Sequence, residues 1–234
     1  MNELVHAKFG MGASVLRKED DAFATGHGRY TDDIKAEGML HGYVLRSPYA
    51  HARFRIADVA AALEADGVRL VLTAADTAHL QPLKNITPIK NGDGSPIINR
   101  DLPVLCDGIV RHVGDAIAFV VADSVAQARD ASELIEVEFE DLDVVVDTEG
   151  ALAEDAPLVY PEAGTNLAFT SFLGDKDKTA KAFSKAARVS ELRIVNNRLV
   201  CNYMEVRACL SQWSEEDGYT VTVNNRTYAV KLDG

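Results

Sequence analysis

The sequence predicts an α+β protein, and three observations support this fold class. Residues 40–73 follow the pattern strand, bend, strand, helix, strand. Residues 116–140 follow the pattern strand, helix, strand. The 234-residue chain is 47% hydrophobic and 26% charged, which is ordinary for a soluble globular protein. It is long enough to bury a core in one large or two small domains.

The first pattern begins with two strands that a sharp bend separates. Residues 40–46 have strand character, and Gly42 inside them lets a neighbouring group approach the backbone closely. Ser47-Pro48 interrupts this strand, because proline cannot donate a hydrogen bond to a sheet. In residues 53–56 arginine alternates with an apolar residue, which predicts a second, half-buried strand.

A short helix and a third strand complete the first pattern. Asp58 can cap an alanine-rich helix at residues 59–65, and Gly67 can close it. The strand is expected at residues 68–73.

Turn signals dominate residues 74–110. Thr73 and Asp76 resemble a capping box, which predicts one short helix after them. Proline and glycine turns then follow one another, so we expect a long loop with little regular structure. A loop of this length is either a contact surface or a disordered insertion, and the sequence leaves both interpretations open.

The second pattern has the clearest periodicity. Residues 116–122, AIAFVVA, are typical of a strand that is buried on both faces. Ser124 and Gln127 indicate a helix start, which predicts a helix at residues 125–134. Residues 135–140, IEVEFE, alternate as a strand with one wet face. Gly114-Asp115 before the buried strand is interpreted as a tight turn and not as a site.

The character of the chain changes after Ala156-Pro157, and we place a boundary between residues 162 and 174. A charged helix is expected at residues 175–187 and a strand at residues 189–195. Residues 208–213 and 219–223 face each other across Glu216-Asp217-Gly218, which predicts a hairpin.

Charge excludes some classes of partner. The chain has 24 Lys and Arg against 36 Asp and Glu, and its net charge of -12 repels nucleic acid and anionic membranes. Residues 123–162 contain thirteen acidic residues and one basic residue, Arg129, so the net charge of this segment alone equals the net charge of the whole chain. We interpret the segment as a solvated face, with a docking patch for a basic partner as the alternative.

Three cysteines, Cys106, Cys201 and Cys209, form no C-x-x-C pair, which favours a reducing compartment over a disulfide framework. Cys106 is expected to be a small buried residue. No stretch has the length of a signal peptide or a membrane span, so we expect a cytoplasmic chain. Gly10-Met-Gly12 does not follow a clear strand and predicts a flexible connector more than a nucleotide site.

Three groups of residues are candidates for chemistry, and each has a structural interpretation that we favour. His41, His51 and His112 could bind a metal, but their spacing matches no ligand rule. Asp32 and Asp33, with Glu37, offer paired carboxylates, although turn formation is the ordinary role of such residues. The third group could hold a phosphate or carboxylate, with an interface or sheet-edge role as the alternative; it consists of Arg46, Arg53 and Arg55.

The chain resembles a known family in three stretches, GRYTDDI, GMLHGYVLRSPYAHARF and VRHVGDAIAFVVADSVAQARDASELIEVEFEDL. They are similar to the N-terminal α/β hammerhead domain of the large, molybdenum-binding subunit of the xanthine dehydrogenase, aldehyde oxidase and aerobic carbon monoxide dehydrogenase family. The resemblance runs from about residue 12 to about residue 213. It implies an arm at residues 1–25, a hammerhead domain at 26–165 and the incomplete start of a molybdenum-cofactor-binding domain at 174–234.

The C-terminal part of the resemblance is mixed. Met204, Glu205 and Arg207 match an M-E-x-R run at the opening of the cofactor domain, and Arg17, Glu19 and Asp20 match an extended lead-in segment. Where the family has a glutamine after the hairpin, this chain has Asn224-Asn225-Arg226. The last ten residues fit the pattern poorly, and a truncated or frameshifted end is one interpretation.

The resemblance implies that the complete subunit holds a molybdenum-molybdopterin cofactor in its cytosine dinucleotide form. Its partners would be iron-sulfur and FAD subunits, and the heterotrimer would form a homo-oligomer. The pterin-binding loop, the active-site loop and the catalytic glutamate of the family lie outside these 234 residues. We therefore assign no catalytic and no metal-binding residue and no known cofactor-binding residue to this chain, and expect no cofactor in the chain alone.

Two functions of different class follow. In the first, the chain is the N-terminal part of a molybdenum hydroxylase that oxidises a small substrate with water-derived oxygen and passes electrons to iron-sulfur and flavin partners. In the second, it is a non-catalytic module that docks an iron-sulfur subunit. The pocket that would distinguish carbon monoxide from purines, aldehydes or N-heterocycles lies outside this sequence.

Overall fold

The computed structural model describes residues 15, 17–86, 88–197, 199–203, 205–216, 218–224 and 226–230. They divide into two compact units, which we describe one at a time. One is Gly38–Glu191, and the other combines the described residues of Met1–Glu37 and Leu192–Gly234. The domain boundaries at residues 26, 165 and 174 remain a prediction about folding units.

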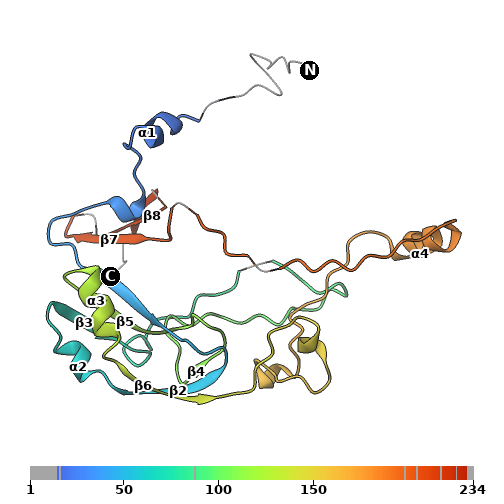
Figure 1. Cartoon of the computed structure of the whole chain (residues 1–234), viewed down its shortest axis with the longest axis horizontal. Coiled ribbons are helices and arrows are strands. Elements are labelled where there is room, and N and C mark those ends of the chain that lie inside the picture. Colours follow the sequence, from blue (N-terminus) through green and yellow to red (C-terminus); the bar gives the residue numbers. More distant parts are fainter. Residues whose placement is uncertain are drawn as a thin grey trace. The chain divides into compact units, whose positions relative to one another are not determined.

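Two antiparallel three-stranded sheets form the centre of the unit Gly38–Glu191 (Figure 1). In the first sheet β5 lies between β1 and β3, and in the second β2 lies between β4 and β6. The strands of the first sheet are β1 (His41–Arg46), β3 (Val68–Leu72) and β5 (Ala116–Ala122). Those of the second are β2 (Ala52–Asp58), β4 (Ile109–Val110) and β6 (Glu136–Asp141).

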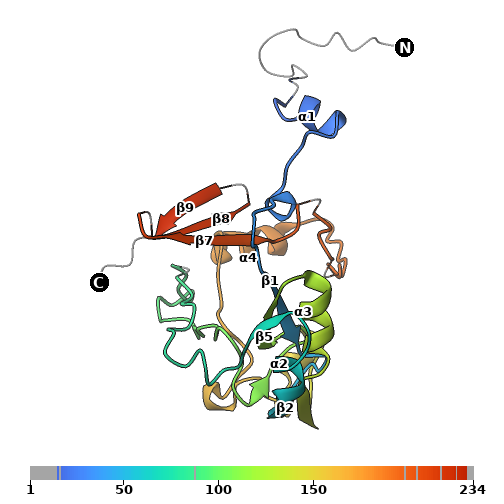
Figure 2. The same cartoon turned by 90° about the vertical axis from the view of Figure 1, so that its left-hand side faces the viewer.

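Each of the two helices of this region joins strands of different sheets. Helix α2 (Ala60–Leu63) leads from β2 to β3, and α3 (Val125–Ser132) leads from β5 to β6. Since β2 pairs with β6 and β3 pairs with β5, the two strand, helix, strand patterns of the sequence are interlocked. Figure 2 shows α3 against β1 and β5.

Small side chains allow α3 to pack closely on the first sheet. Ala128 and Ala131 of α3 are buried, and Ile117, Ala118 and Val120 of β5 are buried as well. Successive strand residues point to opposite faces, so burial of both Ile117 and Ala118 shows that β5 is covered on both sides. The prediction of a doubly buried strand is confirmed.

The predicted caps are present, but one predicted helix is shorter and another is absent. Ser124 Oγ accepts a hydrogen bond from Gln127 N at 3.3 Å, and Asp58 Oδ1 accepts one from Ala60 N at 3.0 Å. Helix α2 ends early because Ala65 N donates to Ala62 O in a turn. Thr73 N and Oγ1 both donate to Asp76 Oδ2 at 2.8 Å, yet turns and not a helix follow.

Residues 80–108 form the long loop that the turn signals predict. Isolated bridges join Leu83 to Leu102 and Lys90 to Pro96. Gly92 N donates to Thr170 O at 2.8 Å, so the loop is also hydrogen-bonded to a segment far along the chain. The described part of the loop is therefore integrated into the fold and is not a disordered insertion.

The region after residue 162 matches the prediction only in part. Helix α4 (Lys176–Lys185) forms as expected, with Asp175 Oδ1 accepting from Lys178 N at 2.9 Å. Its residues are all exposed. The strand expected at residues 189–195 is wrong, because these residues pair with no strand in the described structure and are exposed. Short 3-10 helices lie at Gly150–Leu152 and Pro161–Ala163.

The second unit contains a three-stranded antiparallel sheet in the order β7 (Cys209–Ser214), β8 (Gly218–Val223), β9 (Arg226–Val230). The predicted hairpin is confirmed, although Asp217 of its turn lies outside the described residues. Strand β9 was not predicted. Val223 pairs with Arg226 across Asn224-Asn225, and Asn224 has a φ of 48°, which asparagine tolerates in two-residue hairpin turns.

Part of the arm is more regular than expected. Helix α1 (Asp20–Ala24) replaces the extended lead-in segment. After the arm, a 3-10 helix, η1, spans Thr31–Asp33. Gly10-Met-Gly12 lies outside the described residues. Among the described helices, none combines the length and the apolar character needed to cross a bilayer.

We predict that Gly42→Val destabilises the protein by about 1 to 3 kcal/mol, the usual cost of overpacking. A Cβ at Gly42 would overlap the ring of Phe119, which is half-buried on the neighbouring strand. Gly92→Val is the matched control. A Cβ there would overlap Phe172, but that side chain is 79% exposed and free to turn away, and Gly92 has no positive φ. Thermal melts that rank the two variants in the opposite order would contradict this placement.

We also predict that limited trypsin digestion cuts first between residues 162 and 185. This span contains α4 with its exposed lysines, whereas the two sheets before it share one buried core. The N-terminal product should remain soluble and folded, as measured by mass spectrometry and circular dichroism. A stable C-terminal fragment as the first product, or unfolding of the N-terminal product, would show that the proposed boundary is wrong.

Candidate functional site

Two of the connections between the sheets, β1 to β2 and β4 to β5, are hydrogen-bonded to each other around Ser47. Ser47 follows β1 at the bend into β2, and residues 111–115 lead from β4 to β5. Ser47 N donates to Asp115 O at 2.8 Å, and Gly114 N donates to Ser47 O at 2.9 Å. Arg46 Nη1 donates to Gly114 O at 2.8 Å. Ser47 is only 2% exposed, so its two backbone bonds are formed away from water.

We call this hydrogen-bonded contact of Ser47 with residues 111–115 the crossing. The carboxylate of Asp115 also belongs to it. Its Oδ2 accepts from Arg111 N at 2.6 Å and from His112 N at 3.2 Å, and Oδ1 lies 2.7 Å from His112 Nδ1. Gly114 has a φ of 96°, which only glycine adopts readily. The interpretation of Gly114-Asp115 as a tight turn is therefore confirmed.

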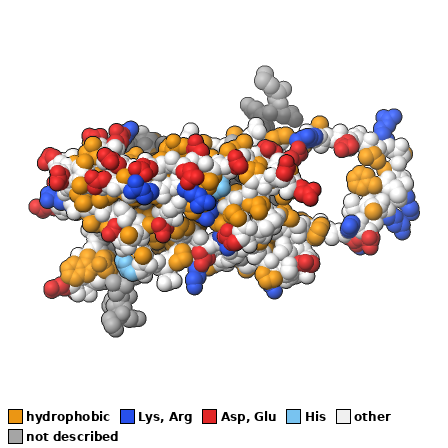
Figure 3. All heavy atoms as spheres, turned by 90° about the horizontal axis from the view of Figure 1, so that it is seen from below, with side chains coloured by type: hydrophobic (Ala, Val, Ile, Leu, Met, Phe, Trp, Pro, Cys, Tyr) orange, Lys and Arg blue, Asp and Glu red, His pale blue; other side chains and the backbone are white. Residues whose placement is uncertain are grey.

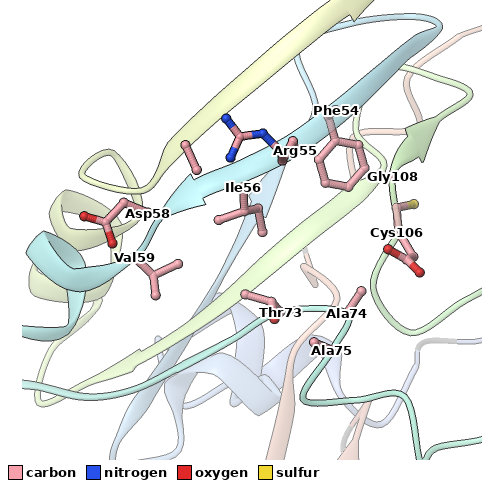
Figure 4. A pocket seen from close by; sticks show the side chains of 12 residues that line it. Phe54, Arg55, Ile56, Asp58, Val59, Thr73, Ala74, Ala75, Cys106 and Gly108 are labelled. Atoms are coloured by element: carbon pink, nitrogen blue, oxygen red, sulfur yellow. The ribbon is translucent and has the colours of Figure 1, made fainter.

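A hollow of about 430 Å³ lies beside the crossing (Figure 4). Its walls come from β2 and the residue after it, from the turn at residues 73–75, and from residues 106–108. In Figure 4 the guanidinium of Arg55 points away from the turn at Thr73, Ala74 and Ala75. That guanidinium binds Glu138 Oε2 at 2.7 Å. The hollow is lined by apolar groups such as Phe54 and Ile56 and by polar ones such as Asp107.

Cys106 lines this hollow, and its thiol is a group that could act as a nucleophile. Its environment suppresses that reactivity. The side chain is buried, and burial, followed by the charge of Asp115, raises the pKa of the thiol from 9.0 to about 11. A thiol with this pKa is protonated at neutral pH, and the thiolate is the form that attacks electrophiles or binds metals. The expectation of a small buried cysteine is confirmed.

This hollow does not fit a molybdenum-pterin cofactor. A phosphate-bearing cofactor needs free cations or backbone N–H groups, and the one cation at the hollow is bound to Glu138. In the described part of the chain, no three His, Cys, Asp or Glu side chains gather to hold a metal ion. The absence of a cofactor site from the whole chain remains a prediction.

The three candidate histidines do not meet. His41 begins β1, while the crossing that contains His112 lies at the other end of that strand. His51 Nδ1 bonds to the carbonyl of Asp143 at 2.8 Å, and its Nε2 is buried without a partner among the described residues. His51 and His112 therefore belong to separate structural contacts.

The candidate carboxylates and arginines also have structural roles. Asp33 Oδ2 accepts from Tyr30 N at 2.9 Å, which stabilises the turn at η1, and Asp32 and Glu37 are exposed. Arg53 and Arg55 lie on one face of β2 opposite Glu140 and Glu138 of β6. The sheet alternative is thus supported, and Arg46 belongs to the crossing.

Arginines neutralise part of the acidic segment 123–162. Besides the pairs on β2 and β6, Arg69 donates two hydrogen bonds of 2.8 Å to Asp123, which lowers the pKa of that carboxyl. On the face shown in Figure 3, acidic side chains are interspersed with basic and hydrophobic ones. Exposed pairs of this kind are screened by water and contribute little to stability, which fits a solvated face.

One cluster was not predicted. The guanidinium carbons of Arg100 and Arg111 lie 5.0 and 4.5 Å from the ring centroid of Tyr160. Arg100 also pairs with Glu162 at 3.3 Å, and Arg111 Nε donates to Val159 O at 3.3 Å. These contacts join the end of the long loop to the 3-10 helix at residues 161–163. Sequence offers no signal for them, because the partners are some fifty residues apart or more.

Comparison with known proteins identifies relatives of the chain. Residues 25–143 match the family model described as aldehyde oxidase and xanthine dehydrogenase, a/b hammerhead domain. The carbon monoxide dehydrogenase large chain of Afipia carboxidovorans is 36% identical over 222 residues, which are 89% of this chain and 26% of that protein. The nicotinate dehydrogenase large molybdopterin subunit of Eubacterium barkeri is 31% identical over 92% of this chain and 47% of its own length.

A solved structure also matches the chain over most of its length. Quinoline 2-oxidoreductase from Pseudomonas putida 86 superposes with a TM-score of 0.74 and 34% identity, over 89% of this chain and 26% of that one. The likeness extends through both compact units. The chain spans about a quarter of the length of the first relatives that it matches.

We predict that Cys106 resists a thiol reagent such as DTNB at pH 8, while Cys201 and Cys209, which are exposed, react at once. Unfolding should release the third thiol. Because the folded pKa of Cys106 exceeds the unfolded value, the stability from its neutral form is complete below pH 9 and is lost between pH 9 and about 11. A Cys106→Ala variant should lose the slow thiol and that pH dependence; three thiols of equal reactivity would contradict the burial.

Proposed function

The chain belongs to the aldehyde oxidase and xanthine dehydrogenase family, and from this premise we propose that it acts as the N-terminal part of the large subunit of a molybdenum hydroxylase. The observation that carries the proposal is the alignment over 89% of the chain with the carbon monoxide dehydrogenase large chain. The alignment includes the family's hammerhead domain and continues beyond it. A complete subunit of this kind would oxidise a small substrate with water-derived oxygen.

The cofactor of the complete subunit would be molybdenum-molybdopterin, and we propose its cytosine dinucleotide form. The name of the Eubacterium barkeri relative supports molybdopterin in the family. When bound, this group supplies the oxidation chemistry. This chain would supply a scaffold, since the hydrogen bonds of Ser47 with Gly114 and Asp115 link its two sheets. The buried thiol of Cys106, which is protonated at neutral pH, would take no part in the chemistry.

Iron-sulfur and FAD subunits would receive the electrons, and the heterotrimer would form a homo-oligomer in the cytoplasm. An alternative function is a non-catalytic module that docks the iron-sulfur subunit. The long loop favours this alternative, because it is fixed by hydrogen bonds yet exposes Leu83, Ile86 and Leu102. Apolar side chains presented on an ordered loop are typical of protein interfaces.

Metal analysis tests the main proposal. We predict that the 234-residue chain, purified from a host that makes molybdopterin, contains no molybdenum and no flavin. The same chain fused to the part of the Afipia carboxidovorans large chain outside the aligned 222 residues should acquire molybdenum. Near-stoichiometric molybdenum in the chain alone, or a folded fusion without molybdenum, would overturn it. Binding of an isolated iron-sulfur subunit to the chain alone, without molybdenum in the fusion, would favour the alternative.

A further inference from the structure

The side chain of Asn91 holds the long loop of residues 80–108 to a distant part of the same unit. Its Oδ1 accepts a hydrogen bond from Thr170 N at 2.9 Å. Its Nδ2 donates to Ser95 Oγ at 3.0 Å and to Pro96 O at 2.8 Å. Thr170 N can only donate and Pro96 O can only accept, so the amide of Asn91 fits these partners in one orientation.

The residue after Asn91 is a glycine, and its backbone nitrogen is engaged as well. Gly92 N donates to Thr170 O at 2.8 Å, so residues 91 and 92 form two hydrogen bonds with Thr170. The full sequence contains one Asn-Gly pair, and it is Asn91-Gly92. Glycine has no Cβ, which lets its nitrogen reach the side-chain carbonyl carbon of the preceding asparagine. This dipeptide is therefore the one in the chain that is most prone to deamidation.

Deamidation needs the atoms that the fold holds in place. The nitrogen of Gly92 forms a bond to Cγ of Asn91, its proton passes to Nδ2, and the Cγ–Nδ2 bond breaks to release ammonia. Water then opens the resulting succinimide ring and leaves aspartate or isoaspartate. In the fold the N–H of Gly92 is donated to Thr170 O and the amide of Asn91 is bonded at both ends, so the loop must open before the attack can occur.

The product does not fit the place that the amide occupies. A carboxylate at residue 91 has no N–H to donate, so its oxygen would face Pro96 O without a proton between them. An unpaired, repelled acceptor of this kind destabilises the closed loop. Isoaspartate would also add one carbon to the main chain beside the bridge between Lys90 and Pro96.

Asp93-Gly94 is the related aspartate motif in the same turn, and its environment makes it less reactive. Asp93 Oδ1 accepts from Ser95 N at 2.9 Å, and the hydrogen bonds from Ser95 lower the pKa of the Asp93 carboxyl. An ionised carboxylate is a poorer target for a nucleophile than an amide. The reactive residue of this turn is therefore Asn91.

We propose that Asn91-Gly92 is a modification site, at which the closed loop suppresses spontaneous deamidation and deamidation releases residues 88–96 from residues 168–170. The reaction takes water as its co-reactant and needs no cofactor, so the inference is independent of the proposed function. Because the lost ammonia is not replaced, the modification converts a brief opening of the loop into a lasting one.

The rate of modification tests the protection. The 234-residue chain is incubated in mildly alkaline buffer, either folded or in urea, and is then digested with pepsin in acid for mass spectrometry. Deamidation at residue 91 should be at least about tenfold slower in the folded chain, because only the open fraction reacts. In urea, Gly92→Val should suppress it, since the added side chain hinders the attack. Equal rates in the folded and unfolded chain, or an unchanged rate in Gly92→Val, would overturn the proposal.

The variant Asn91→Asp tests the release of the loop. Hydrogen exchange at the amides of Gly92 and Thr170 should become at least about tenfold faster than in the unmodified chain. Asn99→Asp is the matched control, because it makes the same change in the same loop where Nδ2 donates one bond, to Asn85 O at 2.9 Å. It should leave exchange at those two amides unchanged.

A second measurement applies if Asn91→Asp alters the circular dichroism spectrum. The chain is then deamidated in urea and refolded, with Gly92→Val treated in the same way as its control. Faster exchange at Thr170 in the first sample alone supports the release. Exchange as slow as in the unmodified chain, or equal acceleration by Asn91→Asp and Asn99→Asp, would show that Asn91 does not hold the loop.

Discussion

Reciprocal strand pairing is the constraint on which the fold of Gly38–Glu191 depends. Strand β2 pairs with β6, and β3 pairs with β5. Along the chain, however, helix α2 joins β2 to β3, and α3 joins β5 to β6. Neither half of the unit can bury its apolar faces alone. The hydrogen bonds of Ser47 with Gly114 and Asp115 join the β1–β2 connection to the β4–β5 connection, so the two sheets are linked at this point.

This arrangement gives Arg55, His51 and His112 hydrogen-bond or ion-pair partners inside the fold. The hollow beside the crossing has an engaged arginine and a protonated thiol, and the histidines lie in separate contacts. The exposed apolar side chains of this unit include Leu83, Ile86 and Leu102 on the loop at residues 80–108.

Local periodicity predicted the elements that depend on local sequence. The alternation in residues 53–56 and the apolar run at 116–122 gave β2 and β5, and Ser124 with Gln127 gave the start of α3. Membership of the sheets was not predictable, because the pairing of Phe54 with Phe139 joins residues far apart in the chain. The strand expected at 189–195 has the periodicity but lacks a partner strand. In the site, the roles of Arg53 and Arg55 became clear only when Glu138 and Glu140 were placed opposite them.

The interlocked pairing also has a consequence during synthesis on the ribosome. When β1, β2 and β3 leave the exit tunnel, β5 and β6 have not yet been translated, and the intervening loop must be completed first. The early strands therefore wait with open edges and uncovered leucines and valines. Slow emergence of residues 74–115 would prolong that exposure, so translation speed through this loop, and access of a chaperone to it, would set the yield of folded protein.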